Sequence, residues 1–113
     1  MDSPEHNLWF KFIECRIQDA IGRFNLNGPD LETQYNDMRK SLKKSGRKYI
    51  RACSTETRSG RYFFETSRFD DLAFLLGYDS LFVNKVFAYI QKSITLDKKL
   101  YEEFGGNHDR RNS

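Results

Sequence analysis

The chain has 113 residues, of which 38% are hydrophobic, 31% charged and 15% aromatic, and this composition excludes a collagen-like or wholly disordered protein. No apolar run approaches the roughly 18 residues of a membrane span, so we expect a soluble protein without a membrane partner, in the cytoplasm or, if viral, in the interior of a host cell. The net charge is only +3, but ten of the 19 basic residues lie between Met38 and Arg68, and this local excess favours a phosphate-bearing or acidic partner.

The N-terminal segment predicts an amphipathic helix. Ser3-Pro4-Glu5 combines an N-cap residue, a proline in the first turn and an acidic residue, which is typical of a helix start. Apolar residues then recur at spacings of three and four as far as the turn sequence 25–29: Trp9, Ile13, Ile17, Ala20, Ile21 and Phe24, with Leu8, Phe10 and Phe12 widening the stripe. A face of this width is buried in the chain's own core or against a second copy, so a homodimer through the first helix is one option.

A second helix is predicted from Pro29-Asp30 to a C-cap at Gly46. Its apolar face consists of Leu31, Tyr35, Met38 and Leu42. Its far half carries four basic residues: Arg39, Lys40, Lys43 and Lys44. Cations at this end also suit the negative pole of the helix dipole, so these residues have a structural explanation beside a functional one.

Residues 47–66 predict a β-hairpin. The stretches 48–55 and 61–66 are rich in aromatic and β-favouring residues, and they flank a plausible turn at 57–60. Basic residues would line the tip and one edge of this hairpin.

Three further helices are predicted after the hairpin. The first follows the capping sequence Ser67-Arg-Phe-Asp70 and ends at Gly77, the second covers about 80–91, and a short third covers about 96–104 with Thr95 as its cap. The fold class is therefore α+β, a compact and mainly helical domain of order ααββααα. We expect one domain at 1–106 and a disordered tail at 107–113.

The segment Phe69–Val86 has the spacing of a DNA-binding motif. Ala73 stands where two helices would cross and Gly77 where the turn needs a positive φ, and five apolar residues fill the joint: Leu72, Leu76, Tyr78, Val83 and Val86. In these positions the pair at about 68–91 resembles the helix-turn-helix of bacterial and phage DNA-binding regulators. The resemblance implies a recognition helix with Ser80, Asn84 and Lys85 facing the DNA. Ordinary packed helices can have the same spacing, so both interpretations stay open.

The sequence carries no pattern of a catalytic, cofactor or metal site. His6 and His108 lie near opposite ends, and Cys15 and Cys53 are far apart and are expected to be reduced thiols. We therefore expect no enzyme, no cofactor and no metal.

These features predict a small nucleic-acid-binding protein, a DNA-binding regulator of phage, plasmid or bacterial type, with DNA preferred to RNA. The alternative is a non-enzymatic protein-interaction module, an inhibitor or adaptor from a mobile element, whose basic face docks on an acidic partner. The candidate contact residues are Arg39, Lys40, Lys43, Lys44, Arg47, Lys48, Arg51, Arg58, Arg61, Ser80, Asn84 and Lys85.

Overall fold

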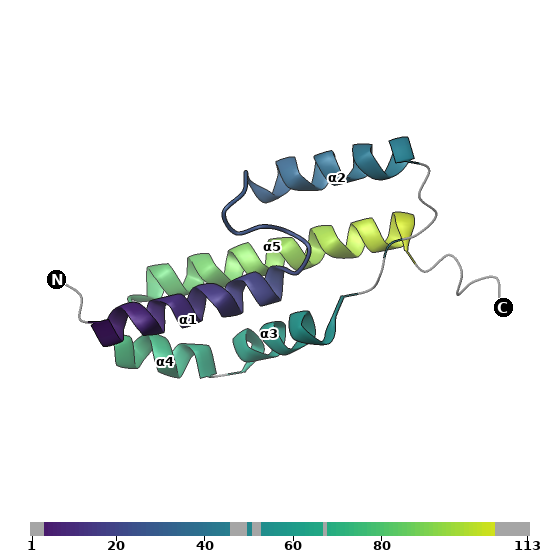
Figure 1. Ribbon diagram of the computed structural model, residues 1–113. Helices are drawn as coiled ribbons and strands as arrows, with labels where there is room; N and C mark the ends of the chain where they lie inside the picture. Colours follow the sequence, from purple (N-terminus) through teal and green to yellow (C-terminus); the bar gives the residue numbers. More distant parts are fainter. Residues whose placement is uncertain (1–3, 46–49, 51–52, 67, 106–113) are drawn as a thin grey trace.

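Five helices make up the protein in the computed structural model, which describes residues 4–45, 50, 53–66 and 68–105. They are α1 (Pro4–Ile21), α2 (Leu31–Ser45), α3 (Thr55–Glu65), α4 (Arg68–Leu76) and α5 (Ser80–Phe104). Helix α5 runs through the molecule, with α1 beside its N-terminal half and α2 beside its C-terminal half (Figure 1). Helices α3 and α4 lie below α1 in this view, and both also contact α5, through Arg61–Asp97 and Phe69–Phe87. The predicted tail at 107–113 lies outside the described residues.

The predicted α+β class is wrong, because the described residues contain helices and no strand. Where the hairpin was expected, Ser54 caps α3: its Oγ accepts the backbone N–H of Thr57 at 3.1 Å. The buried residues of α3 are Thr57, Gly60 and Phe64, at helical spacings of three and four. The expected turn at 57–60 is therefore the first part of a helix, whose buried face packs on α1.

Gly60 allows the close contact between α1 and α3 and does not lie in a turn. A Cβ atom added to Gly60 would lie 2.7 Å from the backbone nitrogen of Ala20 and 2.7 Å from Cβ of Asp19. Only glycine allows the two helices to approach this closely. Packing against α1 thus overrides the strand preference of the aromatic residues at 62–64.

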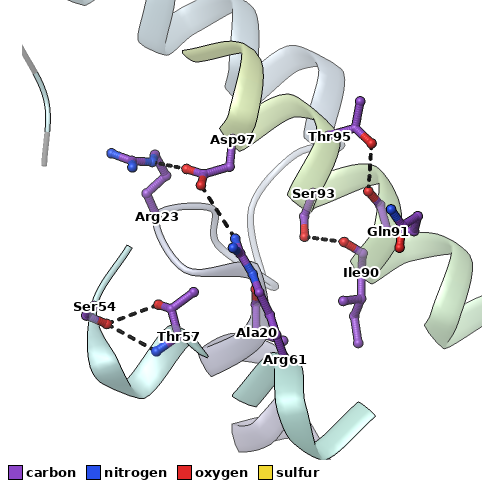
Figure 2. Close-up of polar contacts among 10 residues, drawn as sticks. All are labelled: Ala20, Arg23, Ser54, Thr57, Arg61, Ile90, Gln91, Ser93, Thr95 and Asp97. Carbon is purple, nitrogen blue, oxygen red and sulfur yellow. Dashed lines mark hydrogen bonds and ion pairs between the residues drawn. The ribbon is translucent and has the colours of Figure 1, made fainter. Parts of the chain in front are cut away.

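The two helices predicted at 80–91 and 96–104 are a single helix, α5. Its buried positions continue at alternating spacings of four and three through the expected break: Val86, Ile90, Ser93, Asp97, Leu100 and Phe104. Thr95 is not a cap, because its Oγ1 donates to the carbonyl of Gln91 at 3.1 Å within the helix (Figure 2). An unbroken buried stripe keeps the helix continuous.

The prediction of α1, α2 and α4 as helices is confirmed, but α1 ends at Ile21, before the turn at 25–29 where its end was expected. The residue after this helix is Gly22, whose φ of 65° is left-handed, and the buried part of the helix's stripe is Ile13, Ile17, Ala20 and Ile21. Helix α4 ends at Gly77 with φ 80°, and the N–H of Tyr78 donates to the carbonyl of Ala73 at 3.0 Å. This is the Schellman arrangement that a C-terminal glycine favours. The predicted caps at Ser3, Gly46 and Ser67 lie outside the described residues.

Candidate nucleic-acid interface

The exposed face of α2 carries three of the predicted contact residues. Lys40, Lys43 and Lys44 are exposed in the second half of this helix, Lys40 and Lys44 opposite the side that packs on α5 and Lys43 at its edge. We call these three residues the lysine face. Among the described residues, neither Lys40 nor Lys44 forms an ion pair, whereas Nζ of Lys43 lies 3.9 Å from Oε2 of Glu103.

The start of α2 is held by the buried amide of Gln34. Its Nε2 donates to the carbonyls of Asn25 at 3.0 Å and Pro29 at 2.6 Å, and its Oε1 accepts the N–H of Asn25 at 2.8 Å. These bonds satisfy the polar atoms of a buried side chain and tie the preceding loop to the helix. The lysine face is therefore presented by a helix that is fixed at its beginning.

Arg39, in the middle of α2, has a structural role. Its Nε donates to Oε1 of Glu103 at 2.8 Å and its Nη2 donates to Oε2 at 3.0 Å, a bidentate pair between α2 and α5. These hydrogen bonds raise the pKa of Arg39 and lower the pKa of Glu103. Arg39 thus positions the lysine face and is engaged by a carboxylate where a phosphate contact was predicted.

The Arg39–Glu103 pair predicts a pH effect. The pKa of Glu103 is lowered by folding, so its contribution to stability is present above its ordinary pKa and is lost as the pH falls through the lowered one. We expect Arg39→Gln to move the pKa of Glu103 up toward its ordinary value. Carboxyl ¹³C NMR titration measures this shift, with Lys11→Gln as a control that should leave Glu103 unchanged. An unshifted Glu103 in Arg39→Gln would contradict the assignment.

The side chain of Arg61 is also bound to other residues of the fold. Its Nε donates to the carbonyl of Ala20 at 3.0 Å, and its Nη2 lies 3.5 Å from Oδ2 of Asp97. The other carboxylate oxygen of Asp97 accepts a hydrogen bond from Nε of Arg23, so one buried acid lies between two guanidinium groups (Figure 2). This triad joins the end of α1, α3 and α5, and Arg61 is not available to an external phosphate.

The remaining predicted contact residues are dispersed. Arg58 is exposed on α3, and Ser80, Asn84 and Lys85 are exposed on the first turns of α5. Arg47, Lys48 and Arg51 lie outside the described residues. Because α5 has 25 residues at about 1.5 Å each, Ser80 lies roughly 35 Å along the helix from Glu103 and the lysine face beside it. The structure therefore does not bring the helix-turn-helix residues together with the lysine face.

A pocket of about 230 Å³ borders the triad, and sequence reasoning did not identify it. It is lined by Gly22, Arg23, Cys53, Ser54, Thr57, Arg61 and Asp97. The only sequence signal was the charge of Asp97 at a position of α5 where the spacing calls for an apolar residue. In the described part of the chain, no group of three or more His, Cys, Asp or Glu side chains is placed to hold a metal.

Comparison with known protein families, curated proteins and solved structures finds no match to this chain. Within the ranges that the structure describes, none of the helices is long and apolar enough to cross a membrane.

Proposed function

We propose that the protein binds nucleic acid, duplex DNA in preference to RNA, through phosphate contacts of the lysine face. The observation that carries the proposal is the exposure of three lysines on one half of α2, two of them without an ion pair among the described residues. In the sequence, Arg47, Lys48 and Arg51 follow them closely. A cluster of this kind attracts phosphates and releases their counterions on binding.

We restrict the contact residues of this proposal to the lysine face. Arg39 and Arg61 drop out because each is bonded to an acid within the fold. Lysines near a helix C-terminus also stabilise the helix dipole. That effect needs only proximity to the helix end, and it leaves the ammonium groups of Lys40 and Lys44 accessible to a phosphate.

The α4–α5 pair remains a proposed second contact region, with Ser80, Asn84 and Lys85 as its polar residues. Three exposed acids, Asp70, Asp71 and Asp79, lie on the same segment. Their negative charge opposes a phosphate backbone, so we place the main contacts on α2.

The second candidate function is a non-enzymatic protein-interaction module. It is favoured by the exposed apolar side chains of α4, since Phe74 and Leu75 are 84% and 79% exposed. Large apolar side chains with such exposure are typical of interaction surfaces. In this function the lysine face would dock on an acidic protein.

Neutralising the lysine face tests the nucleic-acid proposal. We expect the triple variant Lys40→Gln, Lys43→Gln, Lys44→Gln to weaken duplex binding and to reduce the log–log salt slope by about 2 to 3, because each lost phosphate contact removes about 0.9. Fluorescence anisotropy with labelled DNA and RNA duplexes at several salt concentrations measures both quantities. The control has the same change of charge at three exposed positions outside the proposed contact regions: Lys11→Gln, Lys92→Gln and Lys98→Gln. Equal losses in the two triple variants, or none in either, would contradict the proposal.

A further inference from the structure

Large apolar side chains are exposed at the end of the molecule opposite the lysine face. They belong to the beginning of α1, to α4 and to the first turn of α5, which lie together at this end (Figure 1). We call them the apolar end: Leu8, Trp9, Phe10, Phe12, Phe74, Leu75 and Leu81. The rings of Phe10 and Tyr78 are 6.4 Å apart and connect α1 to the turn between α4 and α5.

The core of the monomer covers these side chains only in part: Phe12 packs edge-on against Phe63 at 5.8 Å but stays 41% exposed. The inward face of α4 is Phe69 and Ala73, both buried, whereas Phe74 and Leu75 lie on its outward face. The inward part of α1 is likewise Ile13, Ile17 and Ala20, which are buried within the same chain. Only the stretch Leu8–Phe12 of the first helix is therefore available to a partner.

The exposed apolar area is large enough for a stable interface. The seven side chains together expose on the order of 700 Å², since a large aromatic side chain presents about 150–250 Å². The largest apolar patch of a typical monomer covers roughly 300–600 Å². A standard protein–protein interface buries about 800 Å² on each partner.

The charges on the same segments indicate which partner covers the apolar end. Three cations, Lys11, Arg68 and Lys85, stand beside four acids, Glu14, Asp70, Asp71 and Asp79. A set with a net charge of only −1 does not select a partner of one strong sign, and the acids disfavour DNA and anionic lipid surfaces. In a two-fold arrangement, however, the cations of one copy can face the acids of the other.

We propose that a second copy of this chain covers the apolar end and forms a two-fold homodimer. The dimer leaves the lysine face of each protomer free at the far end, so dimerisation does not require nucleic acid and does not block the main contacts on α2. It covers the proposed second contact region on α4 and the start of α5. The contact includes the first turns of α1 together with α4 and the start of α5.

Sedimentation velocity of the full chain tests the dimer without any ligand. From low to several hundred micromolar protein, we expect the mass to rise from 13.4 kDa to twice that value. The double variant Phe74→Glu, Leu75→Glu should remain monomeric, with an unchanged helical circular dichroism spectrum because both side chains point away from the core. Ala88→Glu, which places the same acid at an exposed position in the middle of α5, should dimerise like the natural chain.

Two results would overturn the proposal. One is a monomer mass for the natural chain at every concentration, including the case in which that monomer binds neutral phospholipid vesicles. The other is a dimer that persists in a folded Phe74→Glu, Leu75→Glu variant, since it would place the contact elsewhere. Neither result depends on whether the lysine face binds DNA.

Discussion

Replacing Asp97 with alanine should lower the free energy of unfolding by about 3–5 kcal/mol, because it leaves two guanidinium groups without their acid in the interior. Asp97 is 9% exposed, and it contacts both Arg23 and Arg61. The two ion pairs of Asp97 contribute less than this to the stability of the natural protein, because the loss in the variant also includes the free-energy cost of two unpaired charges in the interior. Chemical denaturation followed by circular dichroism measures the change.

Two further variants distinguish the loss of stability caused by breaking the buried triad from the effect of removing any one negative charge. The double variant Asp97→Leu, Arg61→Met should recover part of the stability, because it removes both partners of one pair. Asp37→Ala removes an exposed acid from α2 and should change stability by no more than about 0.5 kcal/mol. A loss below about 1 kcal/mol for Asp97→Ala would contradict a structural role for the triad.

Replacing Gly60 with alanine should destabilise the protein by about 2 kcal/mol, although the same change at an exposed helix position stabilises by nearly 1 kcal/mol. The new Cβ would meet backbone atoms of α1 at 2.7 Å, so α1 and α3 must separate and lose part of their contact. Thermal and urea unfolding measure the effect. Ser41→Ala, at an exposed position of α2, is the control for helix propensity and should stabilise slightly. A stabilised Gly60→Ala variant would show that α1 and α3 are not in close contact.

The helices were predictable where residues of the same segment determine their formation. Helix α4 ends at Gly77, as predicted, whereas α1 ends at Gly22, before the turn at 25–29 that was expected to end it. The apolar spacing of α1 indicated its buried residues Ile13, Ile17 and Ala20. Helix α3 was not predicted, because the aromatic residues at 62–64 and Gly60 favour a strand and a turn when their neighbours are unknown. Contact with the backbone of Ala20 makes the helix the better solution, and α1 lies far from Gly60 in the sequence.

The candidate interface was predictable only in part, for a similar reason. The charge density of the sequence indicated Lys40, Lys43 and Lys44, which are exposed. It could not show that Arg39 and Arg61 pair with Glu103 and Asp97, because both acids lie on α5 and the contacts depend on the packing of α2 and α3 against it. Local sequence shows where charges are, and the tertiary fold decides which of them are neutralised.

The most direct test of the nucleic-acid proposal is an NMR titration of the ¹⁵N-labelled protein with a short DNA duplex. The proposal predicts that the amide signals of α2 around Lys40, Lys43 and Lys44 shift with added duplex, and that raising the salt concentration reverses the shifts. Shifts confined to α4 and the start of α5, or no shifts at low salt, would contradict it.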